Sequence, residues 1–367
     1  MKAFPFLLLL GLSSYPAQAL RRPIDGGEEV KIPPKDLYQM TEPSVCTLTR
    51  ISVDWLITAA HCVVEGGVVL SSVTIPRVEV VSIHVNPGYL KARKADKTTP
   101  EGSLCEGCEG LDVALIRTRR MPRPEGGHFA TLVSEATTLP NRREITVYGY
   151  GDTTPFWDGK SFESMYRSGD PAEERKLQLG KNVFEDCDYL RAPGPVRDLE
   201  KFSTELTSFL TFKAKREHSI VSGQLEVKAT PGAGLLPGDS GGPVIEKDGS
   251  GKNIITGISS ATEITATNLR ISVVDTVTGA VTEIPLAGKK HTDDELRDWE
   301  LFSKADAKFP FMKKYLKAAG FLDRTGKVPA QFVVKRTYDV EYKSYVVNLA
   351  NKENQTFLKQ MLNPPKK

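Results

Sequence analysis

The most constraining feature of the chain is the segment 238–243, which reads Gly-Asp-Ser-Gly-Gly-Pro and leads directly into the apolar pair Val244-Ile245. Glycine loses more backbone entropy on folding than any other residue, so three glycines around one hydroxyl indicate a backbone conformation that other residues cannot adopt. Two interpretations fit the segment alone: a glycine-rich turn between strands, or a loop that presents Ser240 as a nucleophile. The second requires a base elsewhere in the chain, and an acid that orients the base.

Short runs rich in Val and Ile, separated by Gly, Pro and Asn, recur through the sequence and predict closely spaced β-strands. The expected strands lie at 45–49, 53–58, 68–73, 78–85, 113–116, 144–150, 225–229, 243–245, 254–259, 269–276 and 332–349. These runs indicate an all-β fold class.

Helices are expected in only a few places. A capping-box pattern begins at Thr292, 311–319 is amphipathic and ends at Gly320, and a weaker helical pattern lies at 197–210. The last expected helix is C-terminal, with a shared apolar face made of Phe357, Leu358, Met361 and Leu362.

The N-terminus has the pattern of a secretory signal peptide over residues 1–19, with Lys2, an apolar core at 4–12 and small residues at Ala17 and Ala19. That core is too short to span a bilayer, and no later stretch approaches transmembrane length. Basic and acidic residues, 49 and 46, are well mixed, unlike the basic stripe of a nucleic-acid binder. We therefore expect an exported protein, secreted or periplasmic, without a membrane or nucleic-acid partner.

Two further segments supply candidates for the base and the acid. An apolar strand runs into Ala59-Ala60-His61-Cys62, where small alanines let the backbone pack closely below an imidazole suited to general-base chemistry. Asp112 starts an apolar run, and a buried carboxylate must be paired or hydrogen-bonded. Alone, His61 fits a core histidine and Asp112 a surface residue at a strand start. Together with Ser240, their order in the chain favours a Ser-His-Asp triad.

The chain has five cysteines, and a bridge from Cys46 to Cys62 would join the histidine turn to the preceding strand. Cys105 and Cys108 could form half of a zinc site, but structural zinc needs four ligands. A disulfide within 105–108, or from one of these residues to Cys187, is the preferred interpretation. We expect no metal and no cofactor.

These residues resemble the trypsin/chymotrypsin family of serine proteases. The resemblance rests on 58–62 (Thr-Ala-Ala-His-Cys), on 112–115 (Asp-Val-Ala-Leu) and on 238–243, with weaker similarity at 147–151, 256–260 and 344–347. It implies two antiparallel six-stranded β-barrels with the active site between them, a C-terminal helix, and helical or irregular insertions.

The resemblance also implies the division of the chain. Residues 24–135 would form the first barrel, with His61 and Asp112, and 136–367 the second, with Ser240. Insertions are expected at about 152–224 and 276–329. Residues 20–23 form a candidate short propeptide.

The resemblance assigns roles to particular residues. Ser240 is the nucleophile, His61 the base and Asp112 the acid, while the backbone N–H groups of Gly238 and Ser240 form the oxyanion hole. The primary specificity pocket involves Gly234, Leu235 and Ser260, which indicates a preference for apolar or small side chains. After trimming, the new N-terminal ammonium of Ile24 would pair with Asp239.

The expected function is a secreted serine endopeptidase that cleaves protein or peptide substrates through an acyl-enzyme; no oligomeric state is indicated. The alternative is a catalytically inert, protease-like binding protein. It is favoured by Ala261 and Thr262, which stand where the family usually has an aromatic residue and a glycine.

Overall fold

The computed structural model describes the residues 28–29, 36–96, 108, 110–121, 131–133, 144–151, 156–157, 162–163, 178–183, 209–221, 224–228, 232–236, 238–247, 253–284 and 310–363. Several predictions from the sequence fall outside these ranges: the signal peptide (1–19), the candidate propeptide (20–23), Ile24, Cys105, Cys187, and the helix behind Thr292. Of the helix expected at 197–210, only residues 209–210 are described, and they are the start of strand β14 (Phe209–Val221), so the prediction was wrong there.

The first lobe is an antiparallel sheet in the order β2-β3-β4-β8-β7. Its strands are β2 (Leu37–Met40), β3 (Cys46–Arg50), β4 (Trp55–Thr58), β8 (Ala114–Thr118) and β7 (Val80–Val85). A small hairpin of β5 (Val64–Glu65) and β6 (Val68–Val69), the 3-10 helix η1 (Ala60–Val63) and the helix α1 (Pro87–Ala95) complete this lobe. The pairing of Thr58 with Ala114 places the end of β4 beside the start of β8. The segments that carry His61 and Asp112 therefore meet.

The second lobe is built on a sheet in the order β1-β13-β10-β16-β17-β19-β14-β15, with β18 and β9 pairing with β17. Its members are β1 (Glu28–Glu29), β13 (Gln178–Val183), β10 (Glu144–Gly149), β16 (Pro243–Lys247), β17 (Asn253–Asp275), β19 (Phe332–Asn348), β14 (Phe209–Val221), β15 (Gln224–Lys228), β18 (Val281–Ile284) and β9 (Thr131–Leu132). The short strands β11 (Phe156–Trp157) and β12 (Phe162–Glu163) pair only with each other among the described strands.

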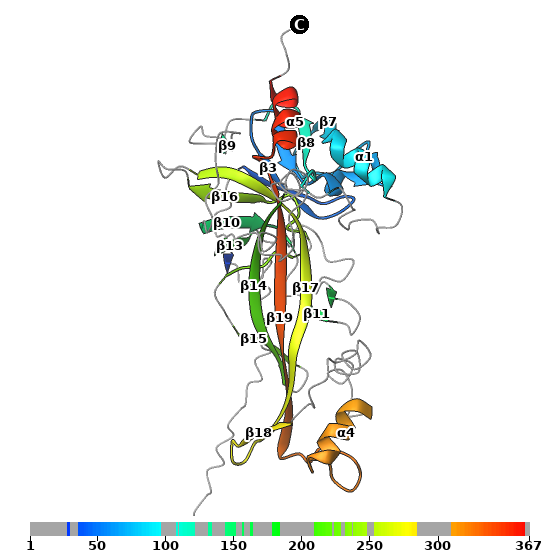
Figure 1. Ribbon diagram of the computed structural model, residues 1–367, viewed down its shortest axis with the longest axis vertical. Helices are drawn as coiled ribbons and strands as arrows, with labels where there is room; N and C mark the ends of the chain where they lie inside the picture. Colours follow the sequence, from blue (N-terminus) through cyan, green and yellow to red (C-terminus); the bar gives the residue numbers. More distant parts are fainter. Residues whose placement is uncertain are drawn as a thin grey trace, which may run out of the picture.

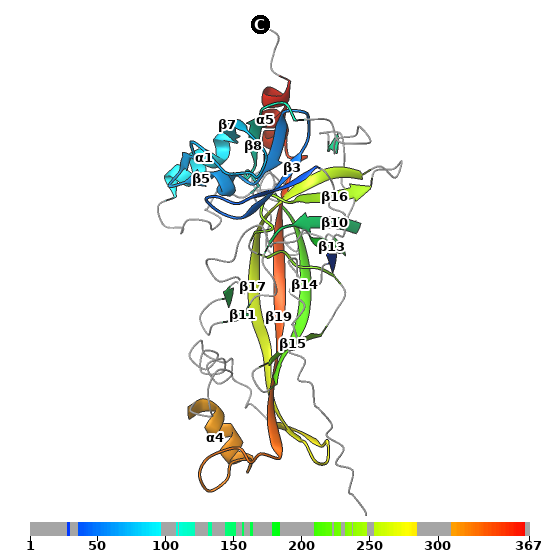
Figure 2. The same cartoon turned by 180° about the vertical axis from the view of Figure 1, so that it is seen from behind.

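Three strands of the second sheet extend far from the first lobe. Figure 1 shows β14, β19 and β17 running side by side away from it towards α4 (Pro310–Ala318) at the other end of the molecule. We call this extension the arm: β14, β15, β18, residues 261–275 of β17, residues 332–345 of β19, and α4. The rest of the described structure is the head. The same arrangement is seen from behind in Figure 2.

The arm differs from the sequence prediction. Separate strands were expected at 254–259 and 269–276, yet β17 is one strand of 23 residues that pairs with β19 over most of its length. The segment between the two predicted strands is extended as well and pairs with β19 through much of its length. The expected insertion 152–224 similarly contributes β14, which pairs with β19 along its full length.

The C-terminal helix α5 (Lys352–Leu362) is confirmed, and it packs on the first lobe. Phe357 and Leu358 are buried in the core of that lobe, and Met361 and Leu362 pack against it. The side-chain amide of the buried Asn354 donates to the carbonyl oxygens of Gly110 and Asn348. The helix therefore connects the end of β19 to the segment that leads into Asp112.

The described structure is mostly β with few helices, and the second sheet is curled, which confirms the all-β class. The helix expected at 311–319 is also confirmed as α4, and Gly320 follows it with a positive φ of 78°. Two closed six-stranded barrels stay a prediction, because the described strands form a five-stranded and a ten-stranded sheet.

Candidate active site

His61 lies in η1, directly after β4, on a turn without free space beneath it. Ala59 and Ala60 are fully buried, as the small residues in this motif predict. The disulfide Cys46–Cys62 is present and joins η1 to the start of β3, which confirms that expectation. The His61 side chain retains 16% of its exposure, so it is held in place yet reachable.

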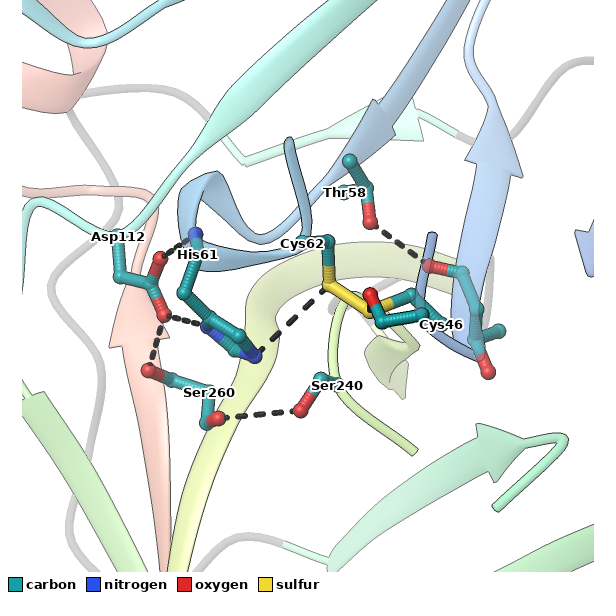
Figure 3. A network of polar contacts seen from close by, with 9 residues as sticks. Cys46, Thr58, His61, Cys62, Asp112, Ser240 and Ser260 are labelled. Carbon is teal, nitrogen blue, oxygen red and sulfur yellow. Dashed lines mark hydrogen bonds and ion pairs between the residues drawn. A yellow bond between two sulfur atoms is a disulfide. The ribbon is translucent and has the colours of Figure 1, made fainter. Parts of the chain in front are cut away.

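Asp112 is fully buried and accepts three hydrogen bonds (Figure 3). Its Oδ1 accepts from the backbone N–H of His61 at 2.8 Å. Its Oδ2 is 2.7 Å from His61 Nδ1 and accepts from the Ser260 hydroxyl at 2.5 Å. Because a carboxylate can only accept, Nδ1 carries the proton of a neutral His61, and Nε2 is left with its lone pair.

The pair shifts the pKa of both partners. Burial opposes the charged form of His61, but the charge and hydrogen bond of Asp112 outweigh it, so the pKa of His61 lies above its usual value. Burial alone would raise the pKa of Asp112, yet the charge of His61 and the hydrogen bonds from His61 and Ser260 hold it below its usual range. Asp112 is therefore a carboxylate near neutral pH, able to stabilise an imidazolium.

Ser240 lies on the loop next to this pair (Figure 3). Its hydroxyl donates to the carbonyl oxygen of Ser260 at 3.3 Å. His61 Nε2 instead lies 3.8 Å from the Sγ of Cys62. No hydrogen bond joins Ser240 to His61 in the described part of the chain. The structure thus brings the three predicted residues to one place and links two of them directly.

The loop around Ser240 leaves two backbone donors open. The N–H groups of Gly238 and Ser240 have no acceptor among the described residues, whereas the neighbouring Asp239 and Gly241 N–H groups bond to carbonyl oxygens. Gly238 has a positive φ of 93°, a conformation that glycine adopts without steric cost. Two unpaired N–H groups beside a serine hydroxyl can receive a developing oxyanion.

Asp239 is fully buried, and its carboxylate accepts from the backbone N–H of Gly151 at 2.9 Å and of Leu236 at 2.8 Å. A Cβ atom at Gly149 or Gly151 would collide with this carboxylate. The glycines of the 147–151 motif thus provide the space for Asp239, a role that the sequence alone did not reveal. The predicted partner Ile24 lies outside the described residues.

The predicted pocket residues pack against the core of the second lobe. A Cβ on Gly234 would approach the ring of Tyr342 to 2.7 Å. Leu235 is only 2% exposed and belongs to an apolar cluster with Phe212 and Val346. Ser260, the third predicted member, is 4% exposed and holds Asp112. Tyr342 is a residue that sequence reasoning missed, because it lies beside Gly234 only through the packing of that segment against β19, where the Leu235 N–H donates to the Ser344 hydroxyl.

The described residues do not offer a metal site at this position. Their cluster of metal-ligating types is Cys46, His61 and Cys62, but the two sulfurs are bonded to each other and provide no thiolate. Cys108 is also disulfide-bonded, which argues against the zinc interpretation of that motif.

Comparison with known protein families finds a match over the first part of the chain. Residues 26–168 match the trypsin family model, which confirms the resemblance to the trypsin/chymotrypsin family of serine proteases. The matched region holds His61 and Asp112, and Ser240 lies beyond it. No curated protein matches the chain. Within the described residues, no helix is long and apolar enough to cross a membrane.

Proposed function

We propose that this protein is a secreted serine endopeptidase of the double-barrel type that hydrolyses peptide bonds through Ser240, His61 and Asp112. The observation that carries the proposal is the buried Asp112–His61 pair, with Ser240 and two backbone N–H groups that have no acceptor among the described residues beside it. Its substrates are proteins or peptides, the substrates of trypsin-like proteases. The proposal needs no metal or cofactor.

The reaction would proceed in two acyl-transfer steps. The Ser240 hydroxyl leaves the Ser260 carbonyl oxygen, gives its proton to His61 Nε2 and attacks the peptide carbonyl. Asp112 stabilises the imidazolium, and the N–H groups of Gly238 and Ser240 bind the oxyanion. His61 then protonates the leaving amine. Water repeats the sequence on the acyl-enzyme and frees Ser240.

Substrate binding would supply the missing Ser240–His61 contact. Hydrogen bonds between catalytic groups are often long or poorly aligned in unliganded enzymes and tighten in the complex. The primary specificity pocket, proposed at Gly234, Leu235 and Ser260, would take small or apolar side chains.

Asp239 would also receive the ammonium group of Ile24 after trimming of residues 20–23. Its complete burial supports this, because a buried carboxylate gains from every additional donor. N-terminal sequencing of the active protein should give Ile24 as the first residue; an active form that starts at Leu20 would exclude the trimming step.

The inert binding protein is the second candidate, and one observation favours it: the Ser240 hydroxyl is bonded to Ser260 and not to His61. A serine-directed fluorophosphonate separates the two functions. The peptidase should be labelled at Ser240 and lose labelling in Ser240→Ala, with kcat on any cleaved peptide falling by roughly a millionfold. Ser272→Ala, on the arm, is the matched control and should be labelled like the wild type. An unlabelled wild type would favour the binding protein.

A further inference from the structure

Thr47 is a fully buried residue of β3 that connects the first lobe to the loop around Ser240. Its backbone N–H donates to the carbonyl oxygen of Ser240 at 2.8 Å. Its hydroxyl donates to the carbonyl oxygen of Gly238 at 3.2 Å and accepts from the backbone N–H of Tyr150 at 3.0 Å. The backbone bonds are available to any residue here, but the hydroxyl bonds need Ser or Thr.

We infer that Thr47 is a positioning residue for the oxyanion hole, acting through its hydroxyl. This inference rests on the proposed peptidase function. Thr47 does not touch the reacting atoms; it holds the loop that carries them.

The two anchored carbonyl groups explain how this works. They belong to the peptide units on either side of the Asp239–Ser240 peptide, which carries the Ser240 N–H. When both flanking units are fixed, the Asp239–Ser240 unit between them cannot rotate freely, so its N–H keeps its direction. This control matters because Gly238 has no side chain to limit its own backbone, and its φ is 93°.

The hydroxyl also joins this loop to the support of Asp239. Tyr150, which donates to the Thr47 hydroxyl, is followed by Gly151, whose N–H binds the Asp239 carboxylate. One hydroxyl therefore connects three segments: β3 of the first lobe, the segment 149–151, and the loop 238–242. Removing it would leave the Gly238 carbonyl and the Tyr150 N–H unpaired at the junction of the two lobes.

The test compares Thr47→Val, which keeps the shape and removes the hydroxyl, with Thr47→Ser, which keeps the hydroxyl. A misplacement of about 1 Å at a catalytic site can cost roughly a hundredfold in rate. We expect Thr47→Val to lower kcat by about a hundredfold with KM changed less than about threefold. A peptide boronate, which imitates the tetrahedral intermediate, should lose affinity in parallel with kcat. The pH midpoint of kcat should not move, because His61 and Asp112 are untouched.

Thr49→Val is the matched control, since Thr49 lies two residues along the same strand, is 1% exposed, and has a hydroxyl without a hydrogen-bond partner in the described structure. It should retain wild-type kcat. Thr47→Ser should stay within about threefold of wild type and remains informative where Thr47→Val does not fold; a hundredfold loss in this variant would assign the effect to the methyl group and overturn the inference.

The outcomes also separate this inference from the proposed function. A wild-type protein that does not react with the fluorophosphonate at Ser240 overturns both. A reactive wild type whose Thr47→Val variant folds and keeps wild-type kcat overturns the role of Thr47 alone.

Discussion

The head and the arm use hydrogen bonds in different ways. In the head, buried side chains such as Asp112, Asn354 and Thr47 each make several hydrogen bonds between segments far apart in sequence. In the arm, the long ladders of β14, β19 and β17 supply hydrogen bonds along their length and charged side chains lie on one surface, although the buried Arg216 also donates to the carbonyl oxygen of Gly232. A ladder keeps its backbone bonds when a side chain changes, whereas a buried polar network does not. The head should therefore be sensitive to single substitutions and the exposed surface of the arm tolerant.

Charged pairs cross the arm from strand to strand. Lys215 of β14 lies 3.0 Å from Asp339 and 3.4 Å from Glu341 of β19. On the opposite surface of the same strands, Ala214, Val340 and Tyr342 are buried in an apolar cluster that includes Leu316 of α4. The apolar layer and the backbone pairing are therefore expected to stabilise the arm more than ion pairs of its exposed side chains, which contribute little.

Two glycines with positive φ give the sharpest contrast between the regions. Gly241 in the head has φ 81°, and a Cβ there would collide with the Thr58 hydroxyl and the Thr47 carbonyl oxygen. Gly279 at the arm has φ 72° and no described heavy atom within 4 Å of such a Cβ. We expect Gly241→Ala to lower the free energy of unfolding by about 1–2 kcal/mol, because alanine is strained at a positive φ. The collision of its Cβ should lower this free energy by about 1–3 kcal/mol more. Gly279→Ala should lower the free energy of unfolding only by the backbone term, about 1–2 kcal/mol.

Urea unfolding, in a Ser240→Ala background that prevents self-digestion, would measure both glycine variants. Equal decreases in the free energy of unfolding for Gly241→Ala and Gly279→Ala would contradict the distinction between head and arm.

The head also contains two histidines with opposite shifts. The pKa of His61 lies above its usual value because Asp112 outweighs burial, while burial and the charge of Arg117 lower the pKa of His84. The ring protons of His61 should therefore titrate at higher pH than those of His84 in NMR spectra of Ser240→Ala. Because the base must be neutral, kcat of the wild type should rise with pH through the higher of these two midpoints.

Asp112→Asn tests the origin of the His61 shift. Burial remains while the negative charge is lost, so the pKa of His61 should fall below its usual value, and kcat should drop by roughly 10⁴-fold. A His61 midpoint that does not move on this substitution would assign the shift to another group.

The smallest effect is expected on the surface of the arm. Arg270, 46% exposed, lies 2.7 Å from Glu217 and 3.5 Å from Asp339. Arg270→Ala should lower the free energy of unfolding by less than about 1 kcal/mol, less still at high salt, and leave kcat unchanged. A large loss of activity in this variant would show that the arm takes part in catalysis.

Local patterns were sufficient for much of the site. The motif at 58–62 predicted a histidine on a closely packed turn, and Ala59 and Ala60 are fully buried there. Cys46 and Cys62 were expected to bridge, and they do. The apolar face of the C-terminal helix predicted α5. Each of these features depends on residues close in sequence or on one short motif, so it can be predicted without a partner segment.

The length of β17 and the contacts of Thr47 could not be predicted in this way. Residues 260–268 were not predicted as a strand, yet in the structure they are extended beside β19. In the sequence, nothing distinguishes Thr47 from any other threonine in a strand. Only the approach of the two lobes brings the loop 238–242 to its hydroxyl.

The sequence by itself determined the residue types of the site and their order, because catalytic chemistry requires particular groups and tight turns require glycine. Only the tertiary structure decided that the Ser240 hydroxyl rests on Ser260, that Gly149 and Gly151 make room for Asp239, and that Thr47 joins the lobes. These contacts join residues roughly 20 to 190 positions apart. Their geometry follows from strand register and lobe packing, which no local pattern encodes.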